Sequence, residues 1–188
     1  MKDIKIAFII FELGSGGQER QMSYTIHSLI REGLRPLLFI WSQEKEIIQD
    51  YGLLSSGISV IRLNGNFFSK IYKIRSSLKT GKIQIFHSWS LLTNIILAIS
   101  TIGSRVKTVG ALRGELFGYY IDKTKKVGSL KTIIQLIFLK NIICNSYSAL
   151  EDMKKLFNTN PFIKKNLFFL RNRTLVNKKK KLNPNELV

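Results

Sequence analysis

The sequence contains little cysteine, histidine and proline: its 188 residues include one Cys, two His and three Pro. Because Cys144 is alone, no internal disulfide can form, as is typical of proteins in a reducing compartment. Zinc sites need three or four Cys, His or carboxylate ligands, so one cysteine and two separated histidines argue against a bound metal. The first residues lead into a strand-like run without a cleavage-site pattern, which favours a cytoplasmic protein.

Acidic residues are also scarce, with 12 Asp and Glu against 30 Lys and Arg, a net charge of +18. The excess is uneven, since residues 1–61 hold 6 basic and 7 acidic side chains, a net of −1. Residues 62–140 hold 14 and 2, a net of +12, and residues 141–188 hold 10 and 3, a net of +7. This distribution predicts a face that binds anions, whether phospholipid, nucleic acid or a phosphorylated substrate.

The sequence has no long run that is apolar throughout. Its longest uncharged stretch, Gln84 to Ser104, has the length of a membrane-spanning helix but includes His87, Asn94 and several serines. A buried strand, a turn and a helix explain this stretch better than a span.

What the sequence does contain is a regular alternation of apolar segments. The predicted strands are Ile4–Phe11, Pro36–Trp41, Ile58–Leu63, Ile83–His87, Lys107–Leu112, Asn141–Asn145 and Leu167–Leu170. The predicted helices are Gln18–Gly33, Glu44–Leu54, Phe67–Lys79, Leu91–Ile102, Leu130–Leu139 and Ser146–Phe157. Buried strands alternating with helices indicate an α/β fold, a Rossmann-like parallel sheet with helices on both faces.

Ligands of such sheets bind beyond the carboxyl ends of the strands, which directs attention to the loops that follow them. In FELGSGGQER, residues 11–20, Ser15 and Gln18 match a capping box and Glu19 suits the positive end of a helix dipole. The adjacent Gly16 and Gly17 are costly in a helix but leave backbone N–H groups open to an anion. The loop thus has two interpretations, a helix cap or a phosphate site. The glycine spacing does not fit a dinucleotide fingerprint, and no Walker lysine follows.

Two further loops contain candidate polar residues. His87 ends a predicted strand, where it is either a structural hydrogen-bonding group or part of a site. Arg113 follows the next strand in ALRGELFGYY and would pair with a ligand phosphate or with Glu115.

The predicted helix Phe67–Lys79 has two stripes at helical spacing. Phe67, Ile71, Ile74 and Leu78 form an apolar stripe expected in the core, and the second stripe is Phe68, Tyr72, Arg75 and Lys79, flanked by Lys70 and Lys73. Aromatic and basic residues on one face are typical of a helix at the surface of an anionic membrane. The alternative is a solvated basic face.

Taken in order, these motifs resemble the amino-terminal domain of a retaining family 4 glycosyltransferase of the GT-B fold. Gly16-Gly17-Gln-Glu19-Arg20 resembles its G-G-x-E-R loop, KIQIFHSWS its "pDiiHxHs" segment, and IICNSYSALEDMKKL its "iiavSealkexl" segment. Arg113 stands where many retaining members have a histidine, as in polysaccharide-type relatives that read "lRg". The resemblance assigns 1–172 to the acceptor-side domain and 173–188 to a linker and the start of a carboxyl-terminal domain that is otherwise missing.

The resemblance implies the acceptor-binding half of a bacterial enzyme that moves a sugar from a nucleotide sugar to a lipid-linked or surface-polysaccharide precursor. The resemblance implies no cofactor, because the nucleotide sugar is a co-substrate held mainly by the missing domain. The resemblance places Gly16 and Gly17 near the donor diphosphate, and Glu19, Arg20, His87, Arg113 and Glu115 on the acceptor side. The expected location is the cytoplasmic face of an anionic membrane. The alternative is a non-enzymatic basic module that binds a polyanion such as nucleic acid, although no nucleic-acid-binding motif is evident.

Overall fold

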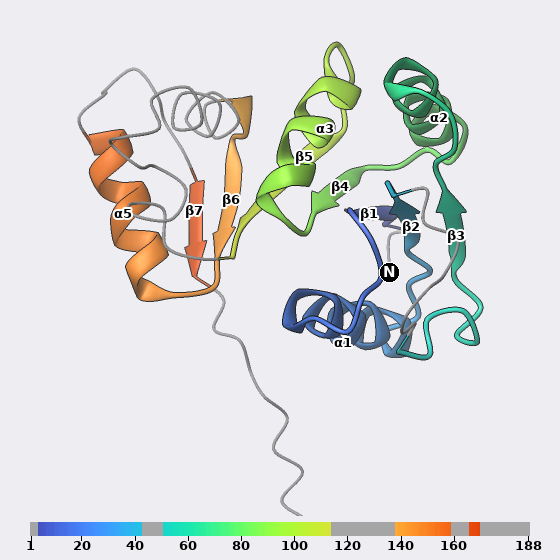
Figure 1. Cartoon of the computed structure of the whole chain (residues 1–188), viewed down its shortest axis with the longest axis horizontal. Coiled ribbons are helices and arrows are strands. Elements are labelled where there is room, and N and C mark those ends of the chain that lie inside the picture. The colour runs from blue at the N-terminus through green and yellow to red at the C-terminus, as the bar shows by residue number, and fades with distance from the viewer. Residues whose placement is uncertain (1–3, 43–50, 114–137, 159–165, 170–188) are drawn as a thin grey trace, which may run out of the picture.

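The computed structural model describes residues 4–42, 51–113, 138–158 and 166–169. Seven parallel strands form one sheet in the order β3-β2-β1-β4-β5-β6-β7 (Figure 1). The strands are β1 (Ile6–Ile10), β2 (Leu37–Ile40), β3 (Ser59–Arg62), β4 (Ile85–Ser88), β5 (Lys107–Leu112), β6 (Asn141–Cys144) and β7 (Asn166–Phe169). The described helices are α1 (Gly17–Arg31), α2 (Phe67–Thr80), α3 (Leu91–Thr101) and α5 (Tyr147–Asn158). The predicted Rossmann-like α/β fold is confirmed, and the ends of these elements lie at most two residues from their predicted bounds.

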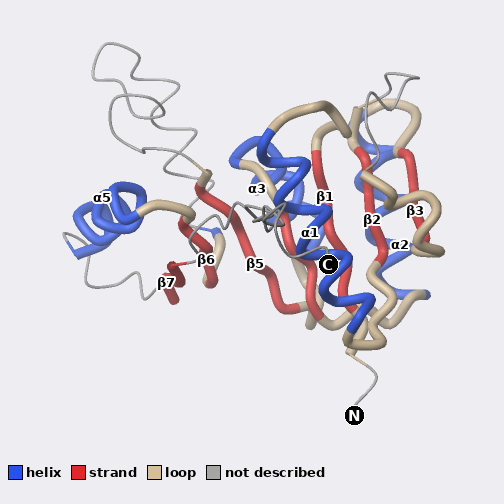
Figure 2. Tube along the Cα trace, turned by 90° about the horizontal axis from the view of Figure 1, so that it is seen from below, coloured by secondary structure: helices blue, strands red, loops and turns tan. Residues whose placement is uncertain are grey.

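The sheet has a buried core on each face because strands β1 and β2 are apolar at every position. On β1, Ala7 and Ile9 belong to one core cluster, while Phe8 and Ile10 belong to the other. Helix α1 adds Met22 and Ile26 to the cluster that contains Phe8 and Ile10. The opposite cluster receives apolar residues of α2, α3 and α5. Figure 2 shows α1 on one side of the sheet and α2 and α3 on the other.

Helix ends are specified locally. Gly33 follows α1 with a φ of 83°, a backbone conformation that favours glycine and ends the helix. Ser90 caps α3 in a reciprocal capping box with Thr93, so the stretch from Gln84 to Ser104 is a strand, a turn and a helix as predicted. In the described part of the chain, no helix has both the length and the apolar character needed to cross a bilayer.

Two predicted helices are only partly open to test. Residues 43–50 and 114–137 lie outside the described residues, so most of the helices predicted at Glu44–Leu54 and Leu130–Leu139 are untested. The end of the first prediction is wrong, because Tyr51 to Gly57 form a turn in which Tyr51 and Gly52 have φ angles of 50° and 74°. Positive φ angles are incompatible with a right-handed helix. The boundary predicted at residue 172 also lies outside the described residues.

Candidate functional site

The strand order locates the crevice where such sheets bind ligands. After β1 the chain moves outward to β2 and β3, and then returns to place β4 on the other side of β1. The loops that leave the carboxyl ends of β1 and β4 therefore run in opposite directions and leave a crevice between them. The candidate site is this edge of the sheet, with the segments that follow β1, β4 and β5.

The loop after β1 presents open backbone at the start of α1. Gly16 is the N-cap residue of α1. Among the described residues, no side chain caps the first backbone amides of this helix. The predicted capping box is wrong: Ser15 lies one residue before the cap and is exposed. The hydroxyl of Tyr51 donates to the carbonyl oxygens of Gly14 and Gly16, at 3.3 Å each, and holds the loop in place. Uncapped amides at a helix N-terminus can bind an anion.

The two glycines of this loop differ in their surroundings. A Cβ atom added to Gly17 would meet nothing within 4 Å, whereas one added to Gly16 would collide with the carboxylate of Glu19. The Glu19 side chain therefore folds back over the N-terminus of its own helix, where a negative charge is favourable. An anionic ligand at the same amides would have to displace this carboxylate.

A cluster of aromatic and basic side chains lies at the carboxyl ends of β4 and β5. The guanidinium of Arg113 stacks 4.0 Å from the ring centroid of Trp89, and the rings of Trp89 and His87 lie 4.9 Å apart. Phe8 on β1 completes the cluster, with ring centroids 5.5 Å from His87 and 6.0 Å from Trp89. Arginine stacking on a tryptophan face is a favourable cation–π contact that fixes the guanidinium in place.

Burial determines the charge state of this cluster. Burial first, and the positive charge of Arg113 second, lower the pKa of His87 from 6.5 to about 3. His87 is therefore neutral near pH 7; its Nδ1–H donates to the carbonyl oxygen of Val109 at 3.0 Å, which leaves Nε2 as an acceptor. Burial also lowers the pKa of Arg113 to about 10, so the guanidinium stays charged at neutral pH. Burial raises the pKa of the nearby Cys144 thiol to about 11, so it is not a nucleophile at that pH.

Sequence reasoning missed Trp89 and Asn94. Trp89 is 1% exposed, and its Nε1–H has no hydrogen-bond partner among the described residues. Asn94 donates through Nδ2 to the carbonyl oxygen of Ala111 at 2.9 Å and accepts through Oδ1 from the Ala111 N–H at 3.1 Å. Its amide thus bonds both backbone groups of Ala111 as a strand would, and the Ser88 hydroxyl also donates to Oδ1. The position of Trp89 directly after a strand was the signal available in the sequence.

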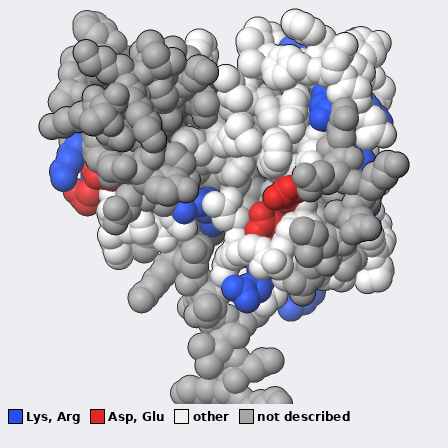
Figure 3. All heavy atoms as spheres, in the orientation of Figure 1, with Lys and Arg blue, Asp and Glu red and all other residues white. Residues whose placement is uncertain are grey.

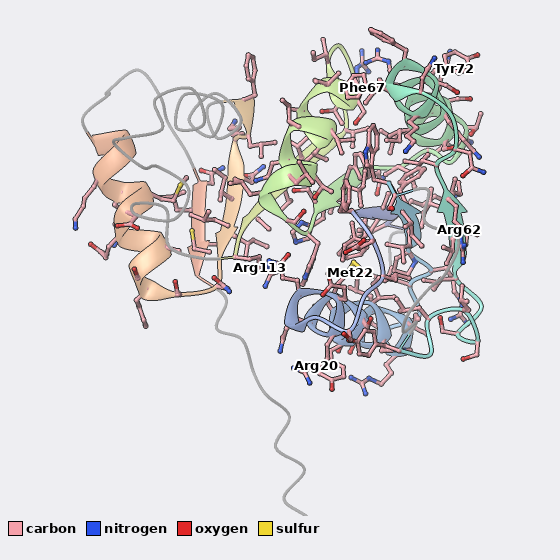
Figure 4. The ribbon with its side chains drawn as sticks, in the orientation of Figure 1. Arg20, Met22, Arg62, Phe67, Tyr72 and Arg113 are labelled. Carbon is pink, nitrogen blue, oxygen red and sulfur yellow. The ribbon has the colours of Figure 1, made fainter. Side chains whose placement is uncertain are left out.

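The predicted site residues do not all come together. Arg113 lies on the sheet side of α1 in Figure 4, whereas Arg20 is exposed on the side of α1 that faces away from the sheet. Glu115 lies outside the described residues. The described part of this face shows Lys and Arg in separate spots, not in one continuous basic surface (Figure 3). No group of three potential metal ligands occurs within the described ranges.

Each of the two stripes predicted on α2 needs one correction. Lys70 is 6% exposed; its Nζ donates to the carbonyl oxygen of Trp41 at 2.6 Å and lies 4.7 Å from the Trp41 ring centroid. Lys70 is therefore not available to a membrane surface. Phe67, predicted in the core, is 42% exposed and makes an edge-on contact with Trp41 instead.

The other members of the stripe are on the surface, as predicted. Phe68 and Tyr72 are 80% and 75% exposed, and Tyr72 points away from the sheet in Figure 4. Arg75 is exposed, but its Nη1 donates to the carbonyl oxygens of Ser100 and Ile102 at 3.3 and 2.9 Å. Lys73 and Lys79 are exposed as well.

Comparison with known proteins gives a fold and no family. No protein-family model matches the chain, and no curated protein matches it either. Among solved structures, HepE from Anabaena in complex with UDP and glucose superposes with a TM-score of 0.69 at 15% identity, over 91% of this chain and 45% of that one. The lipopolysaccharide outer core galactosyltransferase WaaB gives 0.60 at 16%, over 82% and 43%. Sucrose-phosphate synthase from Thermosynechococcus elongatus gives 0.64 at 12%, over 91% and 48%.

These neighbours are GT-B glycosyltransferases, and the chain has the fold of part of each. It spans less than half the length of all three.

Proposed function

We propose that the chain is the acceptor-binding half of a retaining, family 4-type glycosyltransferase. Its donor would be a nucleotide sugar and its acceptor a lipid-linked or surface-polysaccharide precursor. The observation that carries the proposal is the superposition of nearly the whole chain on less than half of HepE, whose structure holds UDP and glucose. The glycine-rich start of α1 and the cluster around Arg113 lie at the sheet edge where such folds bind ligands.

The amides at Gly16 and Gly17 are proposed to face the donor diphosphate. Both residues are exposed, and no side chain caps these amides within the described ranges. The Glu19 carboxylate lies close to Gly16. Glu19 would move aside for the diphosphate and accept a hydrogen bond from a sugar hydroxyl instead. The helix dipole stabilises an anion at an exposed helix N-terminus by about 0.3–1 kcal/mol.

Arg113, His87 and Trp89 are proposed to receive the acceptor. Arg113 supplies a positive charge for an acceptor phosphate, and the Trp89 ring fixes its direction. His87 supplies a neutral acceptor at Nε2 for a hydroxyl, and its low pKa argues against a role as a general acid at neutral pH. The Trp89 indole N–H is a buried donor that a ligand oxygen could satisfy. Glu115, outside the described residues, is also proposed for the acceptor side, whereas Arg20 faces away from the sheet and is not part of this cluster.

Tryptophan fluorescence offers a direct test, because the chain has only two tryptophans, Trp41 and Trp89. In a Trp41→Phe background, titration with a sugar diphosphate on a short prenyl chain should change the emission of Trp89. Arg113→Gln should weaken this binding at least tenfold, equivalent to about 1.4 kcal/mol. The matched control is Arg35→Gln, which removes the same charge from an exposed position.

Equal binding in the two arginine variants would contradict the assigned acceptor site. We also expect no sugar transfer by this chain alone with UDP-glucose and related donors, because it spans less than half of the transferases that it superposes on. Turnover by the chain alone would contradict its assignment as one half.

The exposed face of α2 is proposed to bind the cytoplasmic surface of an anionic membrane. Phe68 and Tyr72 would enter the interface, with Lys73 and Lys79 beside phospholipid phosphates. Each Lys or Arg near such a surface contributes about 1 kcal/mol. Sedimentation with phosphatidylglycerol vesicles should therefore show binding that Phe68→Ser with Tyr72→Ser weakens. Tyr147→Ser, an exposed aromatic position on α5, is the control. Tighter binding to duplex DNA than to vesicles would favour the polyanion-binding alternative that the net charge of +18 suggests.

A further inference from the structure

A large groove lies at the edge of the sheet opposite the candidate site. It has a volume of about 1340 Å³ and is lined by the second half of α2, the end of α3 and the turns that lead into β4 and β5. All strands are parallel, so the starts of β4 and β5 lie at the amino edge, whereas the glycines of α1 and Arg113 lie at the carboxyl edge. The groove is therefore separate from the proposed transferase site.

Among the residues that the structure describes, the charged ones that line this groove are all basic. They are Arg75, Lys79, Lys82, Arg105 and Lys107, which we call the basic groove, and no described Asp or Glu lines it. Within the described ranges the one ion pair is Lys154 with Glu151 on α5, so none of the five has a described carboxylate partner. Like charges that converge on one hollow repel each other, and a bound anion relieves this repulsion.

Helix capping accounts for part of this charge but not for the rest. The last carbonyls of α2 and α3 carry partial negative charge, and Arg75 donates to two carbonyl oxygens at the end of α3. Lys79 lies in the last turn of α2 and has the same explanation. Lys82, Arg105 and Lys107 come after the two helices, are exposed, and make no side-chain hydrogen bond to any described residue. These three cations are the excess for which the described part of the chain gives no internal partner.

The turn that carries Lys82 is unusual for a lysine. Lys82 has a φ of 51°, in the left-handed region that favours glycine or asparagine. A glycine would adopt this backbone at lower cost, so the sequence keeps a long cationic side chain at a conformationally unfavourable position. This is consistent with a role for the charge itself.

Exposed apolar side chains lie at the basic groove. Tyr72 and Ile4 line it and are 75% and 42% exposed, and Ile102, beside the lining residue Gly103, is 63% exposed. Cations next to exposed apolar groups match the boundary between the head groups and acyl chains of a bilayer. A site for a soluble anion does not require such a rim.

We propose that the basic groove binds a phosphate group, held by Lys82, Arg105 and Lys107. The ligand favoured by the rim is the head group of an anionic phospholipid, and the other source of the same chemistry is a soluble pyrophosphate. This inference rests on the membrane surface proposed above for α2. It adds a defined site for one phospholipid head group to the general electrostatic attraction between α2 and an anionic membrane. It does not depend on glycosyl transfer.

The test compares two triple variants that lower the net charge equally. Lys82→Gln, Arg105→Gln and Lys107→Gln remove three of the five cations of the basic groove. The control changes Arg35, Lys140 and Lys155 to Gln at exposed positions elsewhere. Both are measured in the full chain by sedimentation with vesicles of phosphatidylglycerol and phosphatidylcholine, and by titration with inorganic pyrophosphate. Circular dichroism melting establishes that both variants fold.

We expect the groove variant to lose at least tenfold in vesicle binding and the control to change less than threefold. If the groove variant binds pyrophosphate as well as the unchanged chain does, the head group is the source of the phosphate. If only the groove variant loses pyrophosphate binding, the source is soluble phosphate. Equal losses in the two triple variants would overturn the proposal and leave general charge attraction. Absence of vesicle binding by the unchanged chain would instead refute the membrane surface of α2. In that case, loss of pyrophosphate binding in the groove variant alone would still support a phosphate site in the groove, and equal pyrophosphate binding in both triple variants would refute it.

Discussion

His87 should make the stability of the fold fall in mild acid. Burial and the nearby Arg113 lower its pKa from 6.5 to about 3 in the folded chain, whereas the unfolded chain keeps the ordinary value. The unfolded state therefore takes up a proton first as pH falls, and this contribution to stability is complete above pH 6.5 and declines toward pH 3. Between pH 8 and pH 5, protonation of His87 in the unfolded chain lowers the free energy of unfolding by about 2 kcal/mol.

Urea unfolding at pH 5 and pH 8 measures this effect. The contribution of the other titrating groups is subtracted by comparison with a variant that lacks His87. The unchanged chain and His87→Gln share all other titratable residues, so the difference between their pH dependences reports His87. We expect the variant to lose about 2 kcal/mol less between pH 8 and pH 5. Identical pH dependences for the unchanged chain and His87→Gln would refute the burial argument.

Three further changes test other parts of the structure. Gly17→Ala should stabilise the chain by up to about 1 kcal/mol, because its methyl meets open space and alanine suits a first helical turn, while weakening anion binding at the α1 amides; thermal melting and pyrophosphate titration measure the two effects. Asn94→Leu should cost about 3 kcal/mol in urea unfolding, because both backbone groups of Ala111 lose their partner; a loss below 1 kcal/mol would contradict this role. Lys70→Met should leave vesicle binding unchanged, since Lys70 is buried against Trp41, whereas an unburied Lys70 would show a loss.

The sheet could be predicted from the sequence because apolar strands and helices alternate in their simplest pattern. Buried parallel strands such as Ile6–Ile10 are apolar at every position, and their helices have apolar residues at spacings of three and four. The strand order could not be read from the pattern in the same way, since it depends on where the chain reverses between β3 and β4.

The errors on α2 have a physical cause. At about 100° per residue, Lys70 lies only about 70° from the axis of the apolar stripe and about 40° from Ile74. We assigned it to the surface because it is charged, but a lysine stem can pack in a core when its ammonium reaches a carbonyl oxygen, here that of Trp41. Phe67 points in the core direction but is the first residue of α2, beside Trp41 at the end of β2. Its exposure depends on the edge of the sheet, which helical periodicity does not describe.

The Arg113–Trp89–His87 cluster was predictable only in part. His87 and Arg113 follow from the rule that site residues lie at the carboxyl ends of strands, but their burial depends on packing against Phe8 and Trp89. The pKa of His87 depends on that burial, so no sequence pattern could give it. Asn94 shows the same limit, because Ala111 is 17 residues away and is brought to it only by the crossover from β4 to β5.

The distribution of charge follows from the direction of the strands. Each helix begins near the carboxyl edge of the sheet and ends near the amino edge, so helix N-termini, with partial positive charge, face the candidate site. Backbone amides can therefore attract an anion there with few basic side chains, in keeping with the net charge of −1 over residues 1–61. The amino edge presents helix carbonyls, which repel anions, so a phosphate site there requires side-chain cations. The five cations of the basic groove lie at this edge. Because exposed side-chain charges are screened by salt, binding at the groove should weaken more steeply with ionic strength than binding at the α1 amides.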